Sequence, residues 1–159
     1  MQRQARGRRR RAACTALLAL AVLPPAQPAA ADSRLTIPAN ATWTSECGAC
    51  HLAYPPQLLP ARAWRQIMQS LDRHFGTDAS LEPRAAEEVR IFLEQHAGRD
   101  RGGSAPARIT ETDWFRREHR EVPAGLWAHP EVKNRANCAA CHRAAERGDY
   151  GERTLRLPR

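Results

Sequence analysis

Large apolar residues recur at helical spacing in the middle of the 159-residue chain. From Ala61 onward they follow one another at three- and four-residue steps, which predicts an amphipathic helix that ends at Gly76. A second such pattern predicts a helix from Ser80, as N-cap, to Gln95 or His96, with acidic residues in its early turns. The apolar positions that we expect to be buried are Trp64, Ile67, Met68, Leu71, Phe75, Val89, Phe92 and Leu93.

The remaining segments have shorter patterns or none. Thr110 or Thr112 is expected to cap a short helix that ends before Pro123. Residues 32–45 and 124–136 show no clear periodicity. These segments therefore add little regular structure to the two longer helices.

The domain organisation follows from these patterns. Residues 98–108 are rich in glycine and charged side chains, which is typical of a solvated linker. It separates an N-terminal half, residues 32–97, from a C-terminal half, residues 109–159. We expect a mainly α fold with little or no sheet, made of these two small halves.

Residues 1–31 have the composition of a secretory signal. Six arginines precede an apolar run at 12–23, and small residues follow at 29–31. We expect cleavage after Ala31 and export to the periplasm. The apolar run is too short to span a bilayer, so an uncleaved anchor is the weaker alternative.

Removal of this segment changes the charge and the cysteine count. It contains six of the 25 basic residues, so the 19 that remain exceed the 17 acidic residues by only two. A nucleic-acid-binding role would need a basic stripe on the mature domain, and this balance argues against one. Cys14 also lies in the segment, which leaves four cysteines.

All four remaining cysteines belong to two copies of one pattern, Cys-x-x-Cys-His, at 47–51 and 138–142. Two thiols at this spacing can each add to one vinyl group of a haem, and the histidine then binds the iron. We expect each copy to start a helix, the first stopped by 54–56 and the second capped by Asn137 and ended at Gly148. The pattern predicts two covalently bound haem c groups, attached through Cys47, Cys50, Cys138 and Cys141, with His51 and His142 as iron ligands.

A zinc site and a redox disulfide are the rival interpretations of these cysteines. Zinc ribbons keep their two cysteine pairs roughly 15 to 20 residues apart, whereas 87 residues separate Cys50 from Cys138. A zinc site also has no use for a histidine after each second cysteine. A thioredoxin-like disulfide needs a βαβ context, and no strand pattern flanks either motif.

The second axial ligand of each iron decides the function. A protein ligand there gives an electron carrier, whereas an open position gives a gas binder or a peroxidase. Met68 is the only methionine outside the signal, and its place in an apolar stripe favours a core role. The candidates that remain are His74, His96, His119 and His129.

Spacing favours two of these histidines. His74 follows His51 by 23 residues, and His119 precedes His142 by 23 residues, which is enough chain to reach the far face of a haem. We predict these two pairs, with His129 or His96 left as alternatives for the second haem. Two histidines on each iron would close both irons to substrate, so we expect an electron carrier and no enzyme. A peroxidase or gas-ligand sensor with one five-coordinate haem is the alternative.

Several stretches of the chain, taken together, resemble the bacterial dihaem cytochrome c family. The stretches are 43–60, 74–81, 109–112, 137–142 and 146–148. The resemblance implies a periplasmic, bis-histidine dihaem electron carrier with a cytochrome-c-like first half. It also implies the partners: a small soluble monohaem c-type cytochrome that binds oxygen, as acceptor, and a b-type membrane cytochrome or other quinol-linked donor.

Overall fold

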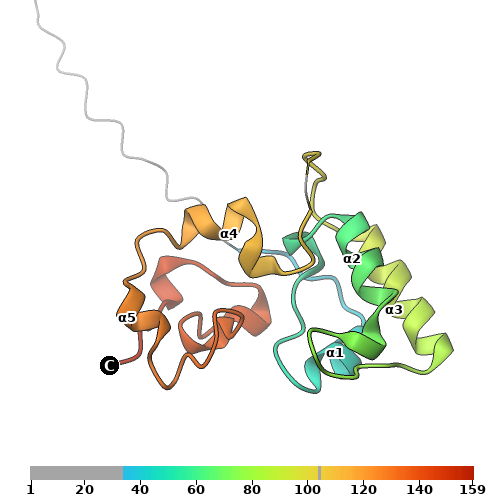
Figure 1. Cartoon of the computed structure of the whole chain (residues 1–159), viewed down its shortest axis with the longest axis horizontal. Helices are drawn as coiled ribbons and strands as arrows, with labels where there is room; N and C mark the ends of the chain where they lie inside the picture. The colour runs from blue at the N-terminus through green and yellow to red at the C-terminus, as the bar shows by residue number, and fades with distance from the viewer. Residues whose placement is uncertain (1–33, 104) are drawn as a thin grey trace, which may run out of the picture. The chain divides into compact units, whose positions relative to one another are not determined.

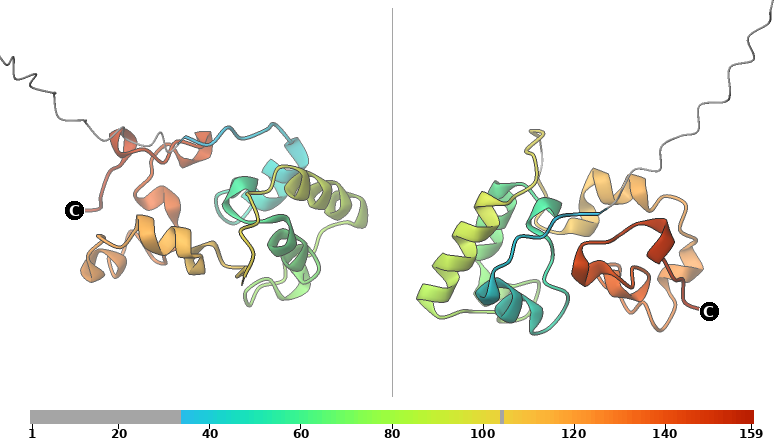
Figure 2. Two further views of the ribbon diagram at one scale, coloured as in Figure 1. Left: turned by 90° about the horizontal axis from the view of Figure 1, so that it is seen from above. Right: turned by 180° about the vertical axis from the view of Figure 1, so that it is seen from behind.

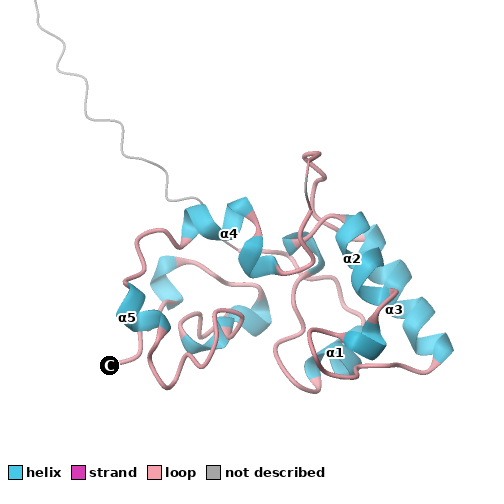
Figure 3. Cartoon of the chain, in the orientation of Figure 1, coloured by secondary structure: helices cyan, strands magenta, loops and turns pink. Residues whose placement is uncertain are grey.

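The computed structural model describes residues 34–103 and 105–159, which belong to one compact unit (Figure 1). The predicted signal, its cleavage after Ala31 and Cys14 lie outside these residues. The described chain is helical and contains isolated bridges but no strand (Figure 3), which confirms the mainly α prediction. None of its helices has the length and apolar character needed to cross a membrane.

Five α-helices and six single turns of 3-10 helix make up the regular structure of the described residues. The α-helices are α1 (Ala41–Gly48), α2 (Ala61–Met68), α3 (Pro83–Gln95), α4 (Asp113–Glu118) and α5 (Ala124–Trp127). The 3-10 turns are Pro56–Leu58, Leu71–Arg73, Ile109–Glu111, Cys138–Ala140, Ala145–Arg147 and Glu152–Thr154.

The main hydrophobic core lies among α1, α2 and α3, where α3 packs against both of the others (Figures 1 and 2). The Trp43 ring lies 5.2 Å from the Phe92 ring, centroid to centroid. Trp64 is buried in the same core, and its indole N–H donates to the Pro56 carbonyl at 2.7 Å, so burial leaves no unpaired donor. The buried members of this core are Trp43, Leu59, Ala63, Trp64, Ile67, Val89, Phe92 and Leu93.

Helix α1 was not predicted, because its apolar residues are too few to form a stripe. A polar cap starts it instead: the Asn40 side chain accepts a hydrogen bond from the Trp43 N–H at 2.6 Å. This cap carries Trp43 into the core. Residues 32–45 show no clear periodicity, yet the chain is helical from Ala41 onward.

Helix α2 ends at Met68, eight residues before the predicted end at Gly76. The Ser70 hydroxyl donates to the Gln66 carbonyl at 3.0 Å, which satisfies one acceptor at the helix end. Helix α3 also differs, because it starts at Pro83 after Glu82, and Ser80 is not its cap. Proline at the first helical position has its φ already set for a helix.

The C-terminal half is built from short turns. The Thr112 hydroxyl caps α4 by accepting from the Phe115 N–H at 3.1 Å, as predicted. A single helical turn, α5, interrupts a region that was expected to be irregular. The second cysteine motif forms one 3-10 turn, so the predicted helix with Asn137 as cap is wrong. The Asn137 amide donates instead to the carbonyls of Glu131 and Val132, both at 3.2 Å.

The N-terminal segment reaches the C-terminal half (Figure 2). The Leu35 N–H donates to the Gly148 carbonyl at 2.8 Å, and Arg34 pairs with Asp149 at 3.0 Å. Gly148 ends its 3-10 turn in the left-handed region at φ 72°. A Cβ there would lie 2.1 Å from the Leu35 carbonyl oxygen, so only glycine allows this approach.

Candidate haem sites

The first motif straddles the end of α1. Cys47 lies in the last turn of the helix, and Cys50 and His51 follow beyond its C-cap, Ala49. The expectation that the motif starts a helix is therefore wrong. The Asn40 cap begins the helix before the motif. The helix ends at Gly48, so Cys50 and His51 lie beyond it and are exposed.

His51 faces His74, as the spacing predicts. Their ring centroids lie 6.3 Å apart and their planes differ by 27°. Because an imidazole nitrogen lies about 2 Å from a metal ion that it binds, two imidazoles on opposite sides of one ion have centroids about 6 Å apart. The separation fits a shared iron. The His51 Nδ1 lies 2.7 Å from the Leu52 carbonyl, and donation to that oxygen leaves Nε2 for the metal.

A tight turn directs His74 toward His51. Phe75 and Gly76 both have positive φ, 51° and 101°, and the Thr77 N–H donates to the His74 carbonyl at 3.1 Å. A positive φ is uncommon for a bulky residue such as phenylalanine, and strain of this kind clusters at functional sites. The Arg108 guanidinium lies 4.1 Å from the centre of the Phe75 ring, a cation–π contact that holds the turn.

The second histidine pair joins α4 to the second motif. The centroids of His119 and His142 lie 6.1 Å apart, with planes at 83°. This separation also fits one shared metal ion. His119 follows the end of α4, where its ring stacks on Phe115 at 4.0 Å and its Nδ1 lies 2.9 Å from the Phe115 carbonyl. Donation from Nδ1 orients the ring and leaves Nε2 for the iron.

The other candidate ligands lie apart from these pairs. His96 packs at 5.0 Å against Phe92 at the end of α3. Both ring nitrogens of His129 have hydrogen-bonding partners: Nε2 lies 3.2 Å from the Arg159 carbonyl, and Nδ1 accepts from the Glu131 N–H at 3.2 Å. These contacts favour His119 over the two alternatives. The ligand assignments stay predictions, now with a matching geometry for each pair.

A cavity of about 490 Å³ surrounds the first histidine pair. Its volume lies in the range of cofactor sites, about 300 to 1,000 Å³. Both cysteines of the first motif line it, and apolar core residues form much of the remaining wall. Met68 lines it too, but from the core side, where it packs with the other buried residues. The residues present therefore suit an apolar macrocycle held at the Cys47 and Cys50 thiols.

Burial raises the pKa of the first cysteine thiol in each motif. Burial, with a smaller effect of Glu46, raises the pKa of Cys47 to about 11. Burial also raises the pKa of Cys138 to about 11. Both thiols are therefore in the protonated form before a haem is attached. Among the described residues, no three His, Cys, Asp or Glu side chains gather as a metal site would require.

The surroundings of His74 and His142 lower the pKa of both imidazoles. Burial lowers the pKa of His74, and the neighbouring His51 and Arg108 lower it further. Burial lowers the pKa of His142 as well, with His119 as the next cause. Both rings are therefore held neutral, which is the form that binds a metal.

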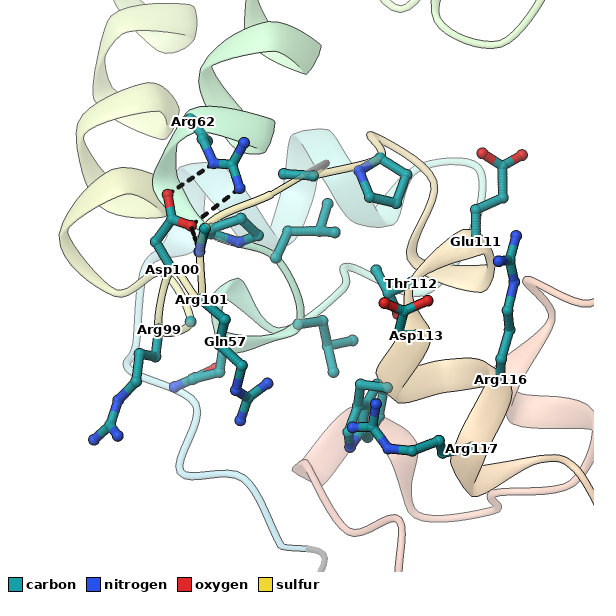
Figure 4. A pocket seen from close by; sticks show the side chains of 18 of the residues that line it. Gln57, Arg62, Arg99, Asp100, Arg101, Glu111, Thr112, Asp113, Arg116 and Arg117 are labelled. Carbon is teal, nitrogen blue, oxygen red and sulfur yellow. Dashed lines mark hydrogen bonds and ion pairs between the residues drawn. The ribbon is translucent and has the colours of Figure 1, made fainter.

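A second cavity, of about 630 Å³, lies beside the linker (Figure 4). Arg99 and Arg101 extend from the linker and Arg116 and Arg117 from α4. Another arginine in its wall, Arg62, is bound to Asp100 by two hydrogen bonds of 2.7 and 3.0 Å. None of the predicted haem-binding residues lines this cavity, so it is separate from the haem sites.

Tyr54 is the residue that the sequence analysis missed, because it was considered only as part of a helix stop. Its ring stacks on His51 with centroids 4.7 Å apart, and its hydroxyl donates to the Ala136 carbonyl at 2.7 Å. Burial and the nearby Cys138 raise its pKa to about 12, so the hydroxyl stays a donor. An aromatic residue three positions after the motif histidine was the available signal.

Two histidine pairs, each beside a Cys-x-x-Cys pair on a helical scaffold, define a c-type cytochrome with two centres. Comparison with known proteins agrees. A family model described as dihaem cytochrome c matches residues 43–150. The chain belongs to the dihaem cytochrome c family, and so it carries two covalently bound haem c groups.

Solved structures of dihaem cytochromes c share the fold. The one from Rhodobacter sphaeroides is 36% identical, with a TM-score of 0.67, and the match covers 73% of this chain and 100% of that one. The one from Shewanella baltica OS155 is 42% identical, with a TM-score of 0.70, over 77% of this chain and 95% of that one. A search of curated proteins finds no match.

Proposed function

We propose that the protein is a periplasmic electron carrier whose two haems are each held by two histidines, His51 with His74 and His142 with His119. The observation that carries the proposal is the pairing of the imidazoles at 6.3 and 6.1 Å. Haem iron supplies reversible one-electron chemistry when it is bound. In each proposed site two histidines of the chain would hold the iron, one on each face of the haem. No position on the iron would then remain for a substrate.

The residues around each pair support transfer without bond chemistry. Contacts of His119 with the Phe115 ring and carbonyl hold that imidazole in one orientation. Apolar core residues line much of the cavity around the first pair. Rigid ligation of this kind keeps a metal site similar in both oxidation states, which suits electron transfer. No enzymatic activity is expected.

We place the carrier between a membrane b-type cytochrome or other quinol-linked donor and a small soluble c-type cytochrome acceptor. Family membership supports electron transport in general, and the signal-like composition of residues 1–31 supports the periplasm. The contact with each partner should be small and transient, at the low end of interface areas.

The purified ferric protein tests the ligation. We expect two low-spin haems by optical and EPR spectroscopy, and no binding of carbon monoxide to the reduced protein. Two haems per chain should be measured by the pyridine haemochrome assay. A high-spin ferric signal or ready gas binding by the native protein would support the alternative, a peroxidase or gas sensor.

Single substitutions then test each ligand. His74→Ala and His119→Ala should each convert one of the two haems to a high-spin form that binds carbon monoxide, because one axial position opens. His96→Ala and His129→Ala are the matched controls and should leave both haems low-spin. If His129→Ala opened a haem and His119→Ala did not, the second pair would be misassigned.

A further inference from the structure

Tyr54 joins the first haem site to the second cysteine motif. Its ring stacks on the His51 imidazole, at 4.7 Å and 22° between planes. Its hydroxyl donates a 2.7 Å hydrogen bond to the carbonyl of Ala136, 82 residues away in sequence. One side chain thus contacts a predicted iron ligand of one site and the backbone that leads into the other.

The segment that receives this bond is held in place by its own contacts. The Ala136 N–H donates to the Asn134 side chain at 2.8 Å. The Asn137 amide donates to two carbonyls of the preceding turn, those of Glu131 and Val132. The Ala136 carbonyl is therefore held in place, and the Tyr54 hydroxyl donates to an acceptor whose position is already fixed by other hydrogen bonds.

The same carbonyl leads directly to the second motif. The Cys138 thiol lies 3.5 Å from the Ala136 carbonyl oxygen. Ala136 and Cys138 also line the cavity that holds His51 and His74. The first attachment cysteine of the second motif is therefore part of the wall of the first site, directly beside Tyr54.

We propose that Tyr54 is a positioning residue that sets the electronic contact between the two haem sites. This inference rests on the proposed function as an electron carrier. In the proposed exchange, one haem would lose an electron and the other would gain it. Tyr54 is not oxidised or reduced, and no proton is transferred. Electrons then pass between the sites inside the protein and do not need to leave it.

Tyr150 provides a matched control. Its ring lies 5.3 Å from His142, edge to face, whereas the Tyr54 ring stacks on His51. Its hydroxyl is buried but has no partner among the described residues. Tyr150 lies near Tyr54 and Cys138, so Tyr150→Phe removes a neighbouring buried hydroxyl while the Tyr54–Ala136 hydrogen bond stays in place.

The experiment uses the full haem-loaded protein. One electron is delivered by pulse radiolysis, and its redistribution between the two haems is followed optically. We expect Tyr54→Phe to slow this redistribution severalfold, because the lost hydrogen bond to the Ala136 carbonyl no longer fixes the distance between the two sites. Tyr150→Phe should leave the rate unchanged, and both variants should keep two low-spin haems.

Two results would overturn the proposal. One is a redistribution rate in Tyr54→Phe equal to that of the wild-type protein. Tyr54 would then only stabilise the fold, even if the melting temperature of the variant were lower. The other is measured on the wild-type protein and is decisive even if Tyr54→Phe fails to accumulate. If the two wild-type haems reach redox equilibrium only when a mediator is added, no electron passes between them inside the protein. Failure of the proposed function would be seen separately, as a high-spin haem in the wild-type protein.

Discussion

The two halves of the molecule have histidine pairs of similar spacing but very different cores. The N-terminal half packs three helices around large buried side chains such as Trp43, Trp64 and Phe92. The C-terminal half has helices of six and four residues and several single turns. Its buried apolar side chains are Phe115 and Val132, with alanines making up the rest.

The difference shows what each half needs to fold. Segments shorter than about 40 to 60 residues bury too little apolar surface to be stable alone and often depend on a metal or a similar group. Residues 109–159 lie in this range. The buried alanines of this half, such as Ala140 and Ala144, contribute little apolar area, so a bound macrocycle would supply apolar contacts that these side chains do not. The first half already has a core of its own.

The largest expected effect comes from preventing haem attachment in each half separately. With Cys138→Ser and Cys141→Ser together, we expect residues 109–159 to lose protection in hydrogen exchange, because that half loses most of its core. With Cys47→Ser and Cys50→Ser together, protection should persist in α3. Equal loss of protection in both proteins would show that the two halves depend on haem to the same degree.

The next effect concerns the core of the first half. Phe92 is buried against Trp43, so Phe92→Ala should cost about 3–5 kcal/mol of unfolding free energy, as cavity-forming changes do. Thermal unfolding followed by far-UV circular dichroism measures it. Ile91, on the same helix, is 40% exposed, and Ile91→Ala should cost much less. Similar losses in both variants would contradict a core confined to one face of α3.

How far the sequence could predict these features depends on whether the determinants are local. Apolar spacing located α2 and α3, and the two motifs with their 23-residue offsets led to His74 and His119. The end of α2 was missed because Ser70 leaves helical geometry at φ −137° and its hydroxyl donates to the Gln66 carbonyl. The positive φ at Phe75 belongs to the later turn that presents His74. Neither feature has a hydrophobic period.

Contacts between distant segments were beyond such reasoning. Tyr54 and Ala136 are 82 residues apart, and Leu35 meets Gly148, 113 residues further along the chain. Nothing in either local pattern marks these partners. The second motif was expected to form a helix because Asn137 is a good cap, but its amide binds carbonyls of the preceding turn. A tertiary contact outweighed a local preference.

A smaller effect tests the link between the N-terminal segment and the C-terminal half. Gly148→Ala would place a Cβ 2.1 Å from the Leu35 carbonyl oxygen, at φ 72°. We expect a loss of about 1–3 kcal/mol, the usual cost of local backbone strain. Gly102→Ala is the matched control, since Gly102 has φ 74° but open space around its Cβ position. Chemical denaturation should show a clearly larger loss at Gly148. Equal losses would mean that the approach of Leu35 is unimportant.

The smallest effect concerns the charge at the same link. The Asp149 carboxylate accepts from the Gly151 N–H, from Arg34 and from Thr154, at 3.0, 3.0 and 3.2 Å. The Gly151 hydrogen bond, followed by the Arg34 bond, lowers the pKa of Asp149 below its ordinary value of 3.8. The unfolded chain then binds the proton more readily, so this stabilisation is present above pH 3.8 and is lost as the pH falls through the lowered pKa.

Asp149→Asn should therefore lower the melting temperature slightly at pH 7, with the difference from wild type shrinking below pH 3.8. Added salt should also reduce the difference, because Arg34 is largely exposed. Asp72→Asn is a suitable control, since its carboxylate is exposed and pairs with the adjacent Arg73. Melting curves measured from pH 7 to acid compare the two. A difference for Asp149→Asn that stayed constant down to the acid limit would show that the carboxylate charge does not hold the N-terminal segment to the second half.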